Sequence, residues 1–152
     1  MEQIASFCVD HTKFGVGMYL SRIDGDVNSY DVRMFKPNGG TYLTPNSLHT
    51  MEHIFATYAR NSFLKEKVIY VGPMGCRTGF YVLLRGNTPE EAIRLVRESL
   101  DYIRDFEGEI PGASIEACGN YLGQDLPTCK KEVLELIEVL KDYTPDMLTY
   151  PQ

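Results

Sequence analysis

The sequence predicts a single α+β domain. Segments rich in strand-forming residues occur in adjacent pairs joined by turn residues, which is typical of an antiparallel sheet. Helical segments lie between and after these pairs, without the regular alternation that builds a parallel sheet. The chain has 152 residues, a length at which one domain buries roughly 68–70% of its unfolded surface. No repeat, charge block or linker divides residues 1–152, so we expect one domain.

The strand expectations depend on alternation and turn chemistry. In Tyr30–Phe35 apolar and polar residues alternate, so the two faces of this segment differ in polarity. Asp24-Gly25-Asp26 has the composition of a hairpin turn, with a connection longer than the tightest type. Gly72-Pro73-Met74-Gly75 is a second turn between strands. We therefore expect four strands, at residues 16–23, 29–35, 67–71 and 80–85.

Two helices begin with clear capping signals. Thr44-Pro45 opens the first helix, because Thr can cap free N–H groups and Pro lacks a donor that would stay unpaired there. Its apolar spacing extends to about residue 62. Thr88-Pro89-Glu90-Glu91 is a capping box, and the apolar stripe of the second helix reaches Ile103.

The C-terminal third is less regular. Residues 108–127 contain several Gly and Pro residues, so we expect mostly loop with at most one short helical turn. Apolar spacing predicts a last helix over about 128–142. The tail 143–152 has two prolines and is expected to fray.

Composition and charge exclude several classes of protein. Against 21 Asp+Glu there are only 15 Lys+Arg, which gives a net charge of −6 and argues against nucleic acid as a partner. No apolar run approaches the roughly 18 residues of a membrane-spanning helix. The first residues have neither a basic nor an apolar signal region, so we expect a cytoplasmic protein with four free cysteines.

A candidate metal site stands in the first helix, in His49-Thr50-Met51-Glu52-His53. The two imidazoles are four residues apart and project from one helix face, at a separation that suits a shared metal. Glu52 borders that face and could handle a proton beside a metal-bound oxygen. Two solvated histidines are the alternative. It is less favoured, because two of the three His in the chain fall in this segment.

A metal needs a further ligand, and Cys118 in a glycine-containing loop is the candidate. A His/His/Cys set with an open position is a catalytic arrangement that suits Zn²⁺, Fe²⁺ or Co²⁺. A buried, structural thiol is the alternative reading of Cys118. Spacing alone does not decide between them.

A second thiol has local features of a reactive residue. Cys76 stands between glycines in a turn, and the adjacent Arg77 would stabilise a thiolate. A turn thiol without a role is the alternative. Cys8 and Cys129 have no such surroundings, and His11 is left unassigned by its neighbours. Phosphate loops, Rossmann fingerprints and nucleophile elbows are absent.

Taken in order, several blocks resemble the S-ribosylhomocysteine lyase family, bacterial enzymes that make the precursor of autoinducer-2. The match extends from about residue 5 to 142, and neither Cys8 nor the tail belongs to it. The matching blocks are Ser6-Phe7…Asp10-His11, Asp31-Val32-Arg33, His49-Thr50-Met51-Glu52-His53, Pro73–Tyr81 and Ala117-Cys118-Gly119-Asn120.

The resemblance implies a reaction and roles for the residues. The family cleaves the thioether of S-ribosylhomocysteine to homocysteine and 4,5-dihydroxy-2,3-pentanedione. A divalent metal, Fe²⁺ in the cell and replaceable by Zn²⁺ or Co²⁺, polarises the sugar oxygens, so that the carbonyl migrates before β-elimination. The implied residues are His49, His53 and Cys118 for the metal, Cys76 and Glu52 for proton transfer, and Ser6, His11 and Arg33 for the substrate.

Members of the family form homodimers with two interface sites built from both chains, and their small antiparallel sheet has helices on one face. The resemblance implies the same assembly and fold for this chain. Two other hypotheses remain. A metallopeptidase with an inverted zinc motif would need a carboxylate third ligand and would leave Cys76 without a task. A non-enzymatic metal or redox sensor is the third.

Overall fold

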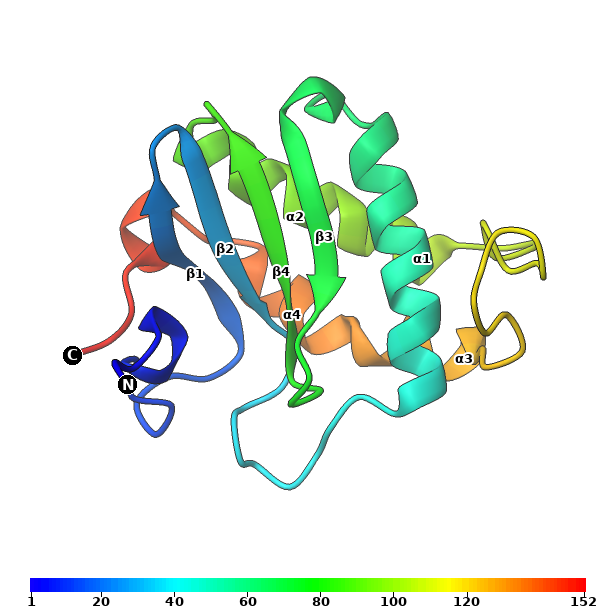
Figure 1. Cartoon of the computed structure of the whole chain (residues 1–152), viewed down its shortest axis with the longest axis horizontal. Helices are drawn as coiled ribbons and strands as arrows, with labels where there is room; N and C mark the ends of the chain where they lie inside the picture. Colours follow the sequence, from blue (N-terminus) through cyan, green and yellow to red (C-terminus); the bar gives the residue numbers. More distant parts are fainter.

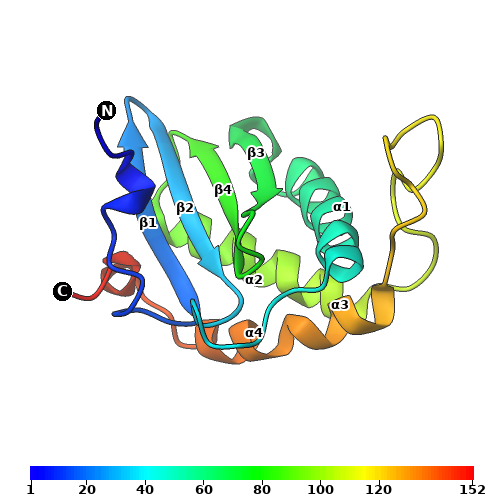
Figure 2. The same cartoon turned by 60° about the horizontal axis from the view of Figure 1, so that its bottom comes forward.

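The computed structural model describes residues 1–152 and contains one four-stranded antiparallel sheet with the order β1-β2-β4-β3. The helices pack on one face of this sheet (Figures 1 and 2). This arrangement confirms the predicted α+β class with helices on one side. The strands are β1 (Gly17–Asp24), β2 (Val27–Arg33), β3 (Val68–Pro73) and β4 (Gly79–Arg85).

The turns differ from their predicted positions. Only Gly25 and Asp26 connect β1 to β2, so the expectation of a longer connection was wrong. Gly25 adopts φ +62°, a conformation that glycine permits and that a two-residue hairpin requires. Gly72 and Pro73 belong to β3, and the turn to β4 lies over residues 74–78.

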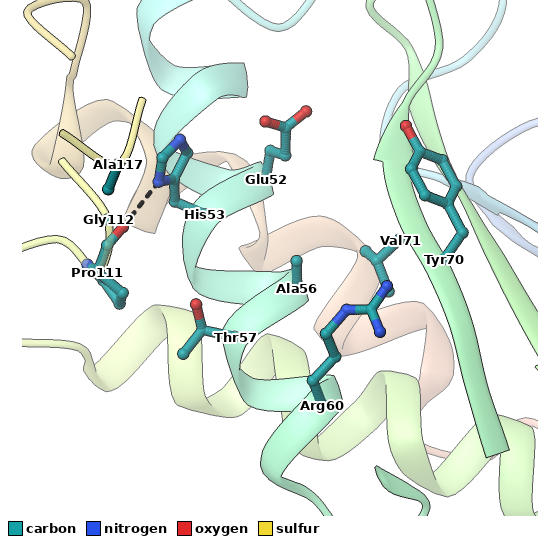
Figure 3. A pocket seen from close by; sticks show the side chains of 10 residues that line it. All are labelled: Glu52, His53, Ala56, Thr57, Arg60, Tyr70, Val71, Pro111, Gly112 and Ala117. Carbon is teal, nitrogen blue, oxygen red and sulfur yellow. Dashed lines mark hydrogen bonds between the residues drawn. The ribbon is translucent and has the colours of Figure 1, made fainter. Parts of the chain in front are cut away.

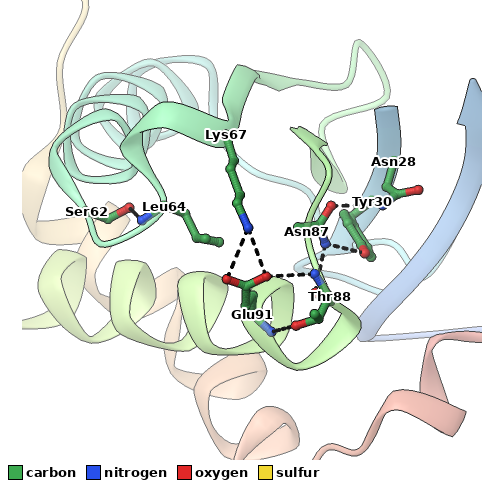
Figure 4. Close-up of polar contacts among 8 residues, drawn as sticks. All are labelled: Asn28, Tyr30, Ser62, Leu64, Lys67, Asn87, Thr88 and Glu91. Carbon is green, nitrogen blue, oxygen red and sulfur yellow. Dashed lines mark hydrogen bonds and ion pairs between the residues drawn. The ribbon is translucent and has the colours of Figure 1, made fainter. Parts of the chain in front are cut away.

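Two long helices begin where their caps predicted. Helix α1 (Pro45–Asn61) starts after Thr44, whose hydroxyl accepts from the Ser47 N–H. Helix α2 (Pro89–Asp105) starts after Thr88, and the capping box with Glu91 is complete. Figure 4 shows the Glu91 carboxylate bonded both to the Thr88 N–H, at 2.8 Å, and to the ammonium of Lys67, at 3.3 Å. The cap of α2 is thereby tied to the segment that leads into β3.

The predicted last helix is divided in two. Helix α3 (Leu126–Glu132) begins earlier than predicted, because the Asp125 carboxylate accepts from the Thr128 N–H and caps it. Helix α4 (Leu134–Leu140) follows after Val133, a turn residue whose backbone stays in the right-handed helical region (φ −86°, ψ −12°). Val133 is β-branched, which lowers its helix propensity and favours an interruption there, and its side chain is fully buried. Residues 108–125 form turns without a helix.

The C-terminal tail does not fray, contrary to the prediction. The Tyr143 hydroxyl donates to the Met18 carbonyl at 2.7 Å, and Leu148 is only 4% exposed. A short 3-10 helix (Pro145–Leu148) follows Tyr143 and ends at Leu148, and the Tyr150 hydroxyl donates to Asp31 at 2.7 Å. Aromatic and apolar residues in the tail therefore dock it on the protein, and its two prolines do not prevent this.

Both faces of β2 are buried, for different reasons. One cluster of 27 buried apolar residues fills the space between sheet and helices and includes Tyr30 and Val32. On the opposite face Asp31 and Arg33 are only 1% and 2% exposed. The predicted difference in polarity is thus present, but the polar face is covered. No helix combines the length and the apolar character needed to cross a membrane.

Candidate active site

The metal-ligand candidates lie together: spacing predicted the pairing of His49 and His53, whereas it had left the position of Cys118 open. His49 and His53 occupy successive turns of α1, and their Nε2 atoms are 3.0 Å apart. The Sγ of Cys118 lies 3.4 Å from His49 Nε2. The three candidate ligand atoms all lie within 4.8 Å of one another. The loop over residues 108–125 thus brings a thiol against the helix, and Cys118 is not a fully buried structural thiol.

Backbone carbonyls orient both imidazoles. His49 Nδ1 lies 2.8 Å from the Gly123 oxygen, and His53 Nδ1 lies 2.7 Å from the Pro111 oxygen (Figure 3). A carbonyl only accepts, so each Nδ1 carries the hydrogen and each Nε2 presents a lone pair. Two such lone pairs 3.0 Å apart repel each other unless a cation lies between them. This is the arrangement by which proteins hold metal-binding histidines.

The donor set fits a borderline divalent ion. Ligands at roughly 2.0–2.3 Å in tetrahedral geometry are separated from one another by about 3.3–3.6 Å. The His49–His53 and His49–Cys118 separations, 3.0 and 3.4 Å, are close to these values. Two imidazoles and one thiolate suit Zn²⁺, Fe²⁺ or Co²⁺ and leave a position open for a ligand.

A buried threonine, Thr50, which the sequence analysis did not select, anchors the loop over residues 108–125, called the metal loop below. The Thr50 hydroxyl donates to Gln124 Oε1 at 2.6 Å and accepts from the Asp125 N–H at 2.9 Å. These bonds hold the residues next to Gly123, whose carbonyl orients His49. The available signal was a hydroxyl on the buried face of the helix, directly after His49.

Glu52 lines a cavity of about 440 Å³ beside the metal-ligand candidates. Figure 3 shows its carboxylate and the His53 imidazole on the same helix, with Arg60 and Tyr70 on the rim of this cavity. No hydrogen bond or ion pair engages the Glu52 carboxylate, although Thr50 and His53 beside it are bonded. Its carboxylate oxygens are therefore accessible to a molecule bound in this cavity.

The other predicted residues gather in a separate cavity of about 360 Å³. Ser6, His11, Arg33 and Cys76 all line it. Arg33 Nη1 lies 3.8 Å from Cys76 Sγ, and the Thr78 hydroxyl lies 3.2 Å from the same sulfur. Cys76 is exposed at the turn between β3 and β4.

Arg77 does not accompany the thiol in the way predicted from its adjacency. Its backbone adopts φ +62°, and its guanidinium donates to the Leu43 carbonyl at 3.2 Å. The cation next to Cys76 is therefore Arg33, from β2. The strained residue helps to shape the turn that presents the thiol.

The Arg33 side chain is fixed by several contacts. Its Nη2 donates to Asp31 Oδ2 at 2.6 Å and its Nη1 to the Thr78 hydroxyl at 2.7 Å. Its guanidinium carbon lies 5.1 Å from the centre of the Phe14 ring. Burial disfavours the charge, but the Asp31 carboxylate outweighs burial and holds the pKa of Arg33 above its usual value.

The two cavities have no lining residue in common. Glu52 and His53 line the first, and Cys76 lines the second together with the predicted substrate residues. The remaining thiols belong to neither: Cys8 is exposed near the N-terminus. Burial raises the pKa of Cys129 to about 12, so this thiol is unreactive at neutral pH.

An α+β fold with a His–His–Cys set that could hold a metal ion beside a cavity is typical of a small metal-dependent enzyme. The chain belongs to the S-ribosylhomocysteinase (LuxS) family, whose sequence profile matches residues 4–145. This confirms the resemblance found in the sequence.

Curated relatives extend over the whole chain. It is 43% identical over 158 aligned positions to the S-ribosylhomocysteine lyase of Clostridium acetobutylicum, with 100% of both chains covered. It is 44% identical to the S-ribosylhomocysteine lyase of Phocaeicola vulgatus, covering 99% of this chain and 98% of the relative. The Porphyromonas gingivalis protein of the same name is also 44% identical, with 99% of each chain covered.

Proposed function

We propose that the chain is an S-ribosylhomocysteine lyase, a carbon–sulfur lyase that releases homocysteine and 4,5-dihydroxy-2,3-pentanedione, the autoinducer-2 precursor. The observation that carries this proposal is the family match over residues 4–145 on a chain that also has an open His–His–Cys set. The relatives that share its full length have the same name.

His49, His53 and Cys118 would hold one divalent metal per subunit, with Fe²⁺ as the ion in the cell and Zn²⁺ or Co²⁺ as substitutes. The lone pairs that these residues direct at one another support this assignment. When bound, the metal supplies Lewis acidity toward the carbonyl and hydroxyl oxygens of the sugar.

Cys76 and Glu52 would exchange the protons. A polarised carbonyl makes the adjacent C–H acidic, so a thiolate and an unpaired carboxylate can move protons between neighbouring sugar carbons and oxygens. The carbonyl reaches C3 by enolisation, and removal of the next proton expels the homocysteine thiolate by β-elimination. The absence of any partner for the Glu52 carboxylate, and the exposure of Cys76, favour these roles.

Ser6, His11 and Arg33 would contact the substrate. They line the cavity of Cys76 and offer a hydroxyl, an imidazole and a guanidinium to the polar sugar. His11 Nδ1 lies 2.8 Å from the Val9 carbonyl, so Nε2 of this ring presents its lone pair.

We infer that a complete site needs two copies of the chain. The thiol cavity and the metal-side cavity share no residue, yet the reaction needs both groups on one sugar. A homodimer that joins the thiol side of one protomer to the metal side of its partner would supply two sites. Mixed dimers of Cys76→Ala and Cys118→Ala chains test this, because each such dimer would contain one intact site.

The cell compartment follows from the chemistry of the thiols. Cys76, Cys118 and a ferrous ion all require reducing conditions, so we place the protein in the cytoplasm. There its products would serve autoinducer synthesis for quorum sensing and the return of homocysteine to the methyl cycle.

The decisive test is thiol release from S-ribosylhomocysteine by anaerobically purified protein, followed with a thiol reagent. Cys76→Ala should keep stoichiometric metal and release no homocysteine, and Cys118→Ala should lose metal in elemental analysis. Undiminished release by Cys76→Ala would reject its role in proton transfer, and full metal occupancy in Cys118→Ala would reject that ligand. Peptide cleavage without thiol release would identify a metallopeptidase instead.

A further inference from the structure

A buried ion pair lies behind the thiol, on the sheet face opposite the helices. Asp31 and Arg33 are 1% and 2% exposed, and Asp31 Oδ2 lies 2.6 Å from Arg33 Nη2. Arg33 lines the thiol cavity, whereas Asp31 does not. Asp31 therefore reaches the thiol itself through its ion pair with Arg33.

The end of the C-terminal tail contacts this pair in two ways. The Tyr150 hydroxyl donates to the same Asp31 Oδ2 at 2.7 Å. The Tyr150 ring stacks on Tyr19, with centroids 4.9 Å apart, and packs at 5.0 Å against Phe14. Phe14 in turn lies under the Arg33 guanidinium, at 5.1 Å. Burial and the nearby Asp31 carboxylate raise the pKa of Tyr150, which keeps its hydroxyl protonated as a donor.

On the Arg33 side the Thr78 hydroxyl and the Phe14 ring also hold the pair, but the Asp31 side has fewer partners. Asp31 Oδ1 and Arg33 Nε are buried without a hydrogen-bond partner. Tyr150 is thus the one side chain besides Arg33 that bonds the Asp31 carboxylate. Losing a partner from a buried charged pair costs more than losing an exposed contact, because water cannot replace it.

We propose that Tyr150 is a positioning residue that, through Asp31, fixes the Arg33 guanidinium against the sulfur of Cys76. The effect on turnover rests on the proposed function, in which Cys76 transfers protons. The tail, 119 residues away from Asp31 in sequence, thereby becomes part of the thiol site.

The test compares two tyrosines of the same tail. Tyr150→Phe keeps the ring that packs on Tyr19 and Phe14 and removes only the hydroxyl. Tyr143→Phe is the matched control, because its hydroxyl bonds Met18 backbone atoms and not the ion pair. Cys76 alkylation by iodoacetamide is followed by mass spectrometry, with exposed Cys8 as the internal reference. Thiol release gives kcat and KM separately.

We expect Tyr150→Phe to slow Cys76 alkylation and to lower kcat by about tenfold, the factor that matches one hydrogen bond to a charged group. Cys8 alkylation and metal content should not change. Tyr143→Phe should lower the melting temperature without slowing Cys76 alkylation. Unchanged Cys76 alkylation in a folded Tyr150→Phe protein would overturn the proposal, as would an equal effect of Tyr143→Phe.

A double-mutant cycle with Arg33→Lys tests the route of the effect. If Tyr150 acts through Arg33, adding Tyr150→Phe to Arg33→Lys slows alkylation no further, whereas independent effects multiply and reject the relay. Asp31→Asn weakens the same ion pair and should also slow Cys76 alkylation. It provides a second test of the proposal if Tyr150→Phe does not fold. Alkylation requires no turnover, so a wild-type protein that releases no thiol would reject the proposed function and leave this test intact.

Discussion

Thr50 provides a direct test of how the metal centre is built. Thr50→Val keeps the shape of a fully buried side chain and removes its hydroxyl. The change deletes the bonds to Gln124 Oε1, at 2.6 Å, and from the Asp125 N–H, at 2.9 Å. Each lost bond costs about 1 kcal/mol, and a buried N–H left without an acceptor adds roughly 1–3 kcal/mol.

The gain from burying a methyl group offsets about 1 kcal/mol of this cost. We therefore expect the free energy of unfolding to fall by about 2–4 kcal/mol, which at roughly 2–4 °C per kcal/mol for a chain of this size lowers the melting temperature by roughly 4–16 °C. The same change loosens the Gly123 carbonyl that orients His49. Loss of such support for a ligand typically weakens metal binding by about 10–100-fold.

Two measurements check this prediction: urea unfolding of the metal-free protein, and Zn²⁺ affinity by competition with a chelator. Thr57→Val is the control, since Thr57 lies half-buried on the same helix and its side chain bonds neither the metal loop nor a histidine. It should change stability by less than about 0.5 kcal/mol. Normal Zn²⁺ affinity in a destabilised Thr50→Val protein would show that the anchor does not reach the metal centre. Unchanged stability would refute the hydrogen-bond argument itself.

Three further changes probe the fold. Gly79→Ala should destabilise the protein by about 1–3 kcal/mol in urea unfolding, because its Cβ would meet the Val32 carbonyl at 2.5 Å, whereas Gly15→Ala, with open space, should not. Thr88→Ala should cost about 1 kcal/mol by removing the cap of α2; an unchanged unfolding midpoint would contradict this. The raised pKa of Cys129, about 12, keeps the folded thiol protonated. The unfolded thiol ionises from about pH 9, so stability falls between about pH 9 and 12, by up to 1.36 kcal/mol per pH unit, and Cys129→Ala should flatten that fall.

The sequence predicted best what local physics decides. The starts of α1 and α2 follow from Thr44 and Thr88, whose capping partners lie three residues away. The spacing of His49 and His53 also predicts that their side chains lie close together, because residues four apart share a helix face. Spacing did not decide whether Cys118 lies beside these histidines. The loop of 18 residues that contains it has no helix, so no periodicity indicates where the chain returns.

The tail and the turns were predicted less well, because distant contacts determine them. Two prolines suggested a frayed end, but Tyr143 and Tyr150 find partners on β1 and β2, more than 100 residues earlier. Likewise, the apolar spacing that predicted one last helix gives no sign that it divides at Val133. The tertiary contacts of the tail outweigh its local propensity, and a single sequence does not show which distant residues will make such contacts.

The surroundings of Cys76 show why adjacency in sequence misled the choice of its cation. Arg77 follows it directly, but a positive φ at Arg77 turns that side chain toward Leu43. The antiparallel register pairs Arg33 with Gly79, and a glycine is required there because any Cβ would strike the backbone of β2. Close approach of the two strands at that point is what lets Arg33 reach Thr78 and Cys76.

The two halves of the site therefore depend on different levels of structure. The metal half needs one helix and one loop, so a local change such as Thr50→Val should weaken it without disturbing the sheet. The thiol half needs a turn, the register of β2 with β4, and the docked tail. Its reactivity should consequently respond to any change that shifts that register or releases Tyr150, even where the metal stays fully bound. Metal content and thiol reactivity are thus separable readouts, and a variant that changes one without the other identifies the half to which its residue belongs.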